Sequence, residues 1–227
     1  MIKEVLSEIH KILDEISSKD LVLDINYPLQ TGNKICWSNN TCLSAYFDID
    51  DIYTLYKKFV KNREFTLLFK DGSLIQIFYE FDKKEIVKHR LFYLNFTVIE
   101  AIKKNENEDE FKFDYNEPLL DQIELLYEHT ENNITYLNTK LLQNIGFLRF
   151  DYDKESSIEI EHPASHLTIN QEGVRIPVEK PLTPYEFFDF ILLHYKNYKL
   201  QDSKKKIFFN DTILDNERKM IHVGKDK

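Results

Sequence analysis

The sequence predicts an α+β protein in which helices pack on an antiparallel sheet. Two apolar runs, REFTLLFK and SLIQIFYEF, flank an Asp-Gly pair, which is typical of a β-hairpin. Apolar residues recur at helical spacing near the N-terminus and over residues 184–197. The chain has 227 residues, of which 42% are hydrophobic and 14% aromatic, a balance that suits one globular domain over residues 1–227 with a sizeable core.

Residues 1–62 are predicted to form a helical and extended subregion of this domain. An apolar stripe makes residues 2–18 an amphipathic helix. Residues 21–47 are expected to be extended. Asp48 is predicted to cap a second helix over residues 49–62.

The Asp-Gly hairpin is predicted to begin an antiparallel meander. Both residues of the pair accept a positive φ angle, so we expect a type I′ turn that places Phe69 opposite Leu74 and Phe65 opposite Phe78. The run EIVKHRLFYLNF is predicted to be the third strand. Because both faces of these strands are apolar, we expect the sheet to be covered on both sides.

The second half of the chain is predicted to complete the sheet. Residues 105–131 carry a dense run of carboxylates, which we interpret as a solvated loop followed by a helix. Strands are predicted around residues 147–152 and 166–178. The tail over residues 199–227 is rich in lysine.

The helix over residues 184–197 has the strongest start signal in the chain. Thr183 is predicted to be its N-cap, Pro184 its first residue, and Glu186 the partner that completes a capping box. This helix is therefore expected to pack its aromatic face on the sheet.

Charge and cysteine content narrow the class of protein. The net charge is −9, which disfavours non-specific binding to a phosphate backbone unless positive charge is clustered. Cys36 and Cys42 match neither a disulfide framework nor a zinc site, so reduced thiols are expected. The N-terminus lacks the pattern of a signal peptide, and no apolar run approaches the roughly 20 residues that cross a bilayer. These features predict a soluble, cytoplasmic protein without a membrane partner.

Two local basic patches leave contact with nucleic acid open as an alternative. Lys57, Lys58, Lys61 and Arg63 cluster at the end of the second predicted helix, and a second cluster covers residues 204–206. A nucleic-acid groove would need these side chains to share one face.

The stretch HPASHLTINQEGVRIP contains the candidate reactive groups. His162 and His166 are four positions apart, as in helical zinc sites. Asp151, Asp153 and Glu161 are near enough in sequence to add oxygen ligands, so a metal-dependent nuclease is one alternative. No spacing demands a metal, and the sequence assigns neither a metal site nor a cofactor.

Metal-independent phosphate chemistry is another alternative. The HLTI segment has the His-x-Thr form of phosphoesterases that use two histidines as acid and base. His166 and His89 would be this pair, with His162 as a second base or ligand. Arg175 and Arg90 would hold phosphate oxygens. The competing interpretation is structural, because a histidine beside a sheet often donates a ring proton to a main-chain carbonyl.

The chain resembles a bacterial family known as domain of unknown function 2290. The resemblance rests on DGSLIQIFYEF, HRLFYL, LRFDYD and HPASHLTINQEGVRIPVEKPLTPYEFFDFILLHY, which span about residues 65–197. The resemblance implies no catalytic residue or cofactor. The bacterial and mobile-element gene neighbourhoods of such proteins favour a role in conflict with phage or foreign DNA.

The leading functional hypothesis is an intracellular accessory or interaction subunit. It would work with a larger protein partner in a bacterial defence-type system, because the sequence contains no complete catalytic motif. The alternatives are the phosphodiesterase or nuclease described above and a nucleic-acid-sensing module.

Overall fold

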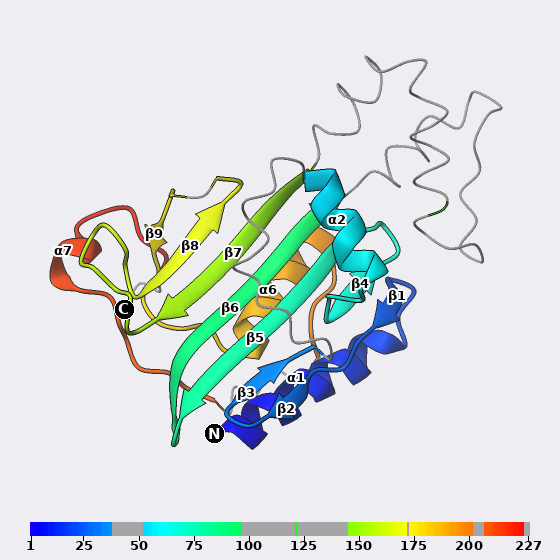
Figure 1. The fold of residues 1–227 in the computed structure, drawn as a ribbon, viewed down its shortest axis with the longest axis horizontal. Coiled ribbons are helices and arrows are strands. Elements are labelled where there is room, and N and C mark those ends of the chain that lie inside the picture. The colour runs from blue at the N-terminus through cyan, green and yellow to red at the C-terminus, as the bar shows by residue number, and fades with distance from the viewer. Residues whose placement is uncertain (38–51, 97–120, 122–144, 172, 202–206, 225–227) are drawn as a thin grey trace, which may run out of the picture.

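The computed structural model describes residues 1–37, 52–96, 121, 145–171, 173–201 and 207–224. These residues form a nine-stranded sheet with helices on its faces (Figure 1). The strands are β1 (Val22–Ile25), β2 (Leu29–Thr31), β3 (Lys34–Cys36), β4 (Leu67–Phe69), β5 (Leu74–Asp82), β6 (Glu85–Phe96), β7 (Ile145–Asp153), β8 (Ser165–Ile169) and β9 (Ile176–Pro177). The helices are α1 (Ile2–Ser17), α2 (Ile52–Lys61), α6 (Pro184–Lys196) and α7 (Asp215–Arg218). The predicted α+β class with an antiparallel sheet is confirmed.

The three longest strands form the centre of the sheet. The main path runs β1-β4-β5-β6-β7-β8-β9, and every pairing along it is antiparallel. Two strands pair with the edge of β5 that faces away from β6. β4 pairs with its first residues, and β3 pairs with Tyr79 and Glu80. β8 and β9 are the short strands expected around residues 166–178.

α1 and α6 cover one face of the sheet and bury the main core. Figure 1 shows both helices behind the strands. Val5, Ile9 and Leu13 of α1 have no exposed surface, and neither have Phe187 and Ile191 of α6. Burying a large apolar side chain of this kind contributes about 1.5–3 kcal/mol, so this layer supplies most of the stability of the fold.

α2 covers part of the opposite face. The ring of Tyr56 stacks on that of Phe96 with centroids 3.9 Å apart, and Phe59 contacts Phe92 edge to face at 6.1 Å. The two-sided cover that the apolar strands predict is therefore confirmed at this end of the sheet.

The α6 N-terminus forms as its sequence predicts. The Thr183 hydroxyl accepts a hydrogen bond from the Glu186 backbone N–H at 3.2 Å, and the Glu186 carboxylate accepts one from the Thr183 N–H at 3.1 Å. Asn197 ends the helix in the left-handed conformation, with φ 50°.

The hairpin register differs from the prediction by one residue. Leu68 pairs with Leu74, and the Phe69 N–H donates to the Ser73 carbonyl at 2.9 Å. Gly72 has a positive φ of 89°, whereas Asp71 does not. The connection is thus a three-residue loop with glycine in the left-handed position, and the predicted type I′ turn is wrong.

The physical reason lies in the side chains around the turn. The Asp71 carboxylate accepts hydrogen bonds from the backbone N–H and the hydroxyl of Ser73, at 2.9 and 2.6 Å. The Lys196 ammonium of α6 contacts the same carboxylate and donates to the Ser73 hydroxyl at 2.6 Å. These contacts hold Asp71 in a conformation that a type I′ turn does not allow.

Several predictions fall on residues that the structure does not describe. These are the interpretations of Cys42, Asp48, residues 204–206 and the acidic segment 105–131 apart from Asp121. Within the described residues, no helix is both long and apolar enough to cross a membrane.

Replacement of Lys196 by methionine should lower the free energy of unfolding by about 3 kcal/mol, because it leaves the largely buried Asp71 carboxylate without this cation. Urea denaturation followed by circular dichroism measures the change. Lys11→Met on exposed α1 surface is the matched control and should change stability by less than about 0.5 kcal/mol. Equal effects of the two substitutions would contradict this account of the turn.

Candidate functional site

A charged pocket of about 240 Å³ lies on the sheet, beside the ends of β6, β7 and β8. Its lining comes from three strands and two flanking segments. The residues are Lys88, His89, Arg90, Arg149, Asp151, Tyr152, Asp153, His162, His166 and Arg175. We call this feature the charged pocket.

Strand register brings the charged side chains together. Arg90 of β6 is directly opposite Asp151 of β7, which in turn is opposite His166 of β8. Residues opposite each other in a sheet point to the same face, so these three side chains meet. Lys88 and Asp153 form the next pair on that face, with an ion pair of 2.7 Å.

Asp151 is the electrostatic centre of the pocket. Its two oxygens accept hydrogen bonds from the Nε atoms of Arg90 and Arg149 at 2.9 and 2.5 Å. Burial by itself would raise the pKa of Asp151, but Arg149, Arg90 and His166 outweigh it and lower this pKa below its ordinary value. The carboxylate is therefore ionised and holds the two guanidiniums in place.

His166 is buried, with one nitrogen committed to the backbone. Its Nδ1 lies 2.9 Å from the Pro163 carbonyl, which can only accept, so Nδ1 carries a proton. Its Nε2 lies 3.6 Å from an oxygen of Asp151. Burial lowers the pKa of His166 more than Asp151 raises it, so the ring is neutral at pH 7 and Nε2 has a lone pair.

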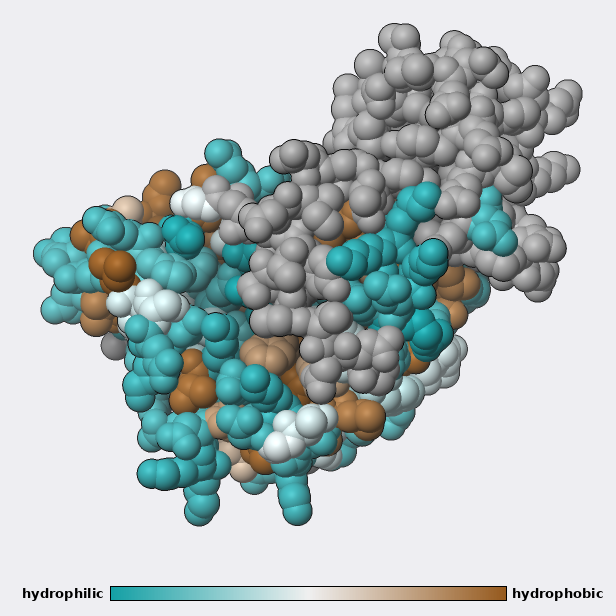
Figure 2. Space-filling model, in the orientation of Figure 1, coloured by the Kyte–Doolittle hydropathy of each residue, from teal (hydrophilic) through white to brown (hydrophobic). Residues whose placement is uncertain are grey.

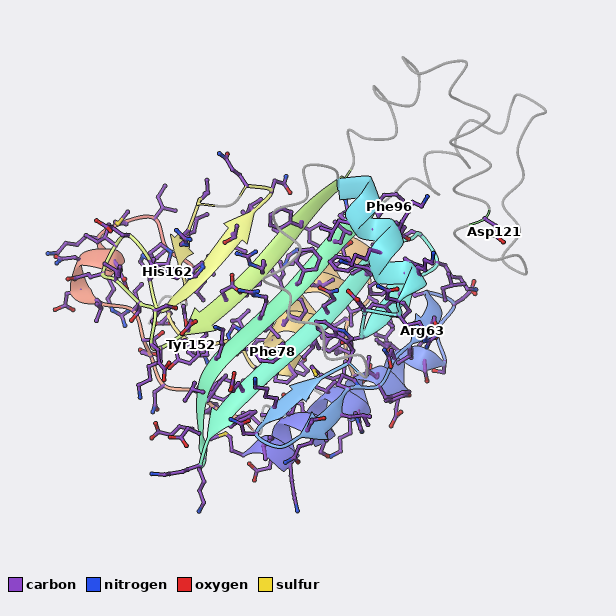
Figure 3. All side chains as sticks on the ribbon, in the orientation of Figure 1. Arg63, Phe78, Phe96, Asp121, Tyr152 and His162 are labelled. Atoms are coloured by element: carbon purple, nitrogen blue, oxygen red, sulfur yellow. The ribbon has the colours of Figure 1, made fainter. Side chains whose placement is uncertain are left out.

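His162 reaches the same place from the loop before β8 (Figure 3). Its ring centroid lies 5.0 Å from that of His166. Two backbone hydrogen bonds with Ile158, of 2.8 and 2.9 Å, close the turn that carries it.

A buried glutamate stabilises this turn. Ile160 has φ 70°, which is costly for a β-branched residue. Its N–H donates at 3.3 Å to Glu217 of α7, which is 1% exposed and also accepts from the Leu214 N–H at 2.8 Å. Glu217 therefore helps to position His162, a role that its distance along the chain concealed.

His89 shares the lining of the charged pocket with His166, but both of its ring nitrogens bond to the backbone. His89 faces the core layer, where its Nδ1 donates to the Phe150 carbonyl at 3.2 Å and its Nε2 accepts from the Leu182 N–H at 3.1 Å. Both nitrogens are therefore occupied by the backbone. Burial lowers the pKa of His89 to about 4. The geometry supports a structural role for His89 and not the acid–base pair considered from the sequence.

Arg175 and Arg90, the two candidate phosphate ligands, both line the pocket. In the described part of the chain, the Arg175 guanidinium has no hydrogen bond or ion pair, and Arg90 uses only its Nε. Each therefore retains N–H donors that can bind an anion. Lys88 and Arg149 are pocket residues that sequence reasoning did not select, although the alternating charges in KHR and RFDYD mark one face of two strands.

The described residues support a metal site less well than a phosphate site. Among the described residues, no three His, Cys, Asp or Glu side chains come together in a way that could hold a metal ion. Asp151 is engaged by arginines, so the metal-dependent alternative gains no support from it.

Comparison with known proteins finds one family. A family model described as "Uncharacterized conserved protein (DUF2290)" matches residues 21–224. No curated protein and no solved structure matches the chain.

The free energy of unfolding should decrease as the pH is lowered, because His89 is buried in its neutral form. Its pKa in the folded state, about 4, lies below the ordinary value of 6.5, so the unfolded chain binds the proton first. The stabilisation is complete above about pH 6.5, falls as the pH decreases towards 4, and amounts to about 3 kcal/mol over this window. Urea denaturation at several pH values measures it. His89→Asn, whose amide can replace the donor to Phe150, should flatten the pH dependence, and an unchanged slope would contradict the assignment.

Proposed function

We propose a function from the charged pocket, because the chain belongs to the DUF2290 family of uncharacterized conserved proteins, whose description states no activity. In this proposal, the protein is a sensing module that binds phosphate groups of nucleic acid or nucleotides. One observation carries this proposal. In a chain of net charge −9, Arg90 and Arg175 present guanidinium donors in one pocket.

Guanidinium groups suit phosphate better than other anions of similar charge. Two N–H groups of one arginine match two phosphate oxygens, and such charge-assisted pairs are about twice as strong as neutral hydrogen bonds. Asp151 fixes Arg90 before any ligand arrives, which lowers the entropic cost of binding.

Basic residues on the same face of the sheet support a nucleic-acid ligand. α2 lies on the same sheet face as the pocket, since its aromatic residues pack on Phe92, two positions after Arg90. This helix carries Lys58 and Lys61, both exposed, and its outer surface is hydrophilic in Figure 2. Arg63, which follows the helix, forms an ion pair with Asp24.

We extend the proposal to an accessory role in the cytoplasm, with a larger protein partner in a bacterial defence-type system. The support is indirect: the pocket residues favour binding, and His89, a candidate catalytic residue, bonds to the backbone on both nitrogens. Co-purification of the tagged full-length chain from its source cell tests the role. Recovery of the protein alone would remove its basis.

Arg175→Ala should weaken binding of a fluorescein-labelled single-stranded oligonucleotide by about 10-fold or more, the effect expected for a lost charge-assisted hydrogen bond. Fluorescence anisotropy at fixed salt measures the affinity. Arg218→Ala is the matched control, because it removes the same charge from outside the pocket. Equal affinities of the two variants would count against the pocket as the binding site.

A second candidate is phosphodiester cleavage, favoured by the two imidazoles 5.0 Å apart beside the arginines. His166 Nε2 would be the base and His162 the acid. His166→Gln should then abolish cleavage of a labelled oligonucleotide by the parent protein while changing the melting temperature little. Absence of cleavage by the parent, with retained binding, would leave sensing as the function.

A further inference from the structure

We propose that the charged pocket selects a terminal phosphate, a monoester at the end of a nucleic-acid strand or on a nucleotide, over an internal phosphodiester. This inference rests on the proposed function and specifies its ligand. It follows from the charge, the ionisable groups and the size of the pocket.

Charge distinguishes the two kinds of phosphate. A monoester carries about −1.5 to −2 at pH 7 and has three free oxygens, whereas a diester carries one charge and has two. Among the described lining residues, Lys88, Arg90, Arg149 and Arg175 oppose Asp151 and Asp153, a net charge of +2 with neutral histidines. This charge balances a dianion and exceeds the charge of a diester by one.

The histidine pair can respond to the charge of the ligand. His166 faces Asp151 and Arg149 from β7, Arg90 from β6, Arg175 from the segment before β9, and His162 from the loop. In the free protein its protonation is opposed by burial and by the positive charge of its neighbours. A dianion in the pocket offsets that opposition, so one imidazole takes up a proton when the dianion binds.

The size of the pocket also favours a strand end. Its volume of about 240 Å³ lies below the roughly 300–1,000 Å³ of ordinary ligand sites. Its lining comes from β6, β7 and β8, the loop that carries His162 and the segment that carries Arg175. Such a space accommodates one phosphate with its sugar more readily than a backbone that continues in both directions.

Three probes test the inference with the full-length protein. They are a single-stranded DNA of about ten nucleotides with a 5′-phosphate, the same DNA with a 5′-hydroxyl, and deoxythymidine monophosphate. We expect the phosphorylated DNA to bind about 10-fold more tightly than its hydroxyl form, the effect of added charge-assisted hydrogen bonds. Arg175→Ala should remove this advantage and Arg218→Ala should retain it. Arg175→Lys, which preserves charge and loses the planar fork, should give a smaller advantage and guards against a folding defect.

The outcomes separate this inference from the proposed function. Equal affinities for the two DNAs, both reduced in Arg175→Ala, would overturn the inference and leave phosphate sensing standing. No binding of any probe would overturn both. Binding of deoxythymidine monophosphate as tight as that of phosphorylated DNA supports the inference and identifies free nucleotides as the source.

Calorimetry adds a readout that general charge attraction would not produce. Titrations of phosphorylated DNA at pH 7 in two buffers of different ionisation enthalpy give the number of protons taken up. We expect net uptake of up to one proton for this probe and less for the hydroxyl form. Equal uptake for both would contradict selection of the dianion.

Discussion

Side chains alternate between the two faces of a β-strand, and this constraint separates the core of the protein from its candidate site. His89 and Arg90 are neighbours in β6, yet one bonds to the backbone in the core layer and the other enters the charged pocket. Because antiparallel register aligns whole faces, the same rule brings Arg90, Asp151 and His166 together from three strands. A slip of one residue in either pairing would disperse them.

Asp151 is a buried charge that is unfavourable by itself but positions the arginines of the pocket. Removing a carboxylate from water is unfavourable, and Arg149, Arg90 and His166 together make ionisation the preferred state here. In return, the arginines are held close together without a ligand. The phosphate site that we propose is therefore preorganised by an ion-pair network in which Arg90 retains N–H donors.

The overall charge of the chain and the charge of the pocket act at different ranges. A net charge of −9 repels polyanions that approach to within about a Debye length and disfavours indiscriminate contact. Inside the pocket, the guanidiniums dominate because they lie close to a bound anion. A protein of this kind tends to bind anions only where their shape lets them enter, which agrees with selection for strand ends.

Local signals in the sequence determined the elements whose causes are local. The capping box of α6 forms as predicted because its partners are three residues apart. The α+β class was predicted from hydrophobic periodicity. His162 and His166 met because they share one short segment. Only the tertiary structure decided the hairpin register, the side to which His89 turns, and the Glu217 contact that positions His162. The hairpin register depends on Lys196, the orientation of His89 on Leu182, and the position of His162 on α7. These groups are distant in sequence, so no local pattern predicts the contacts.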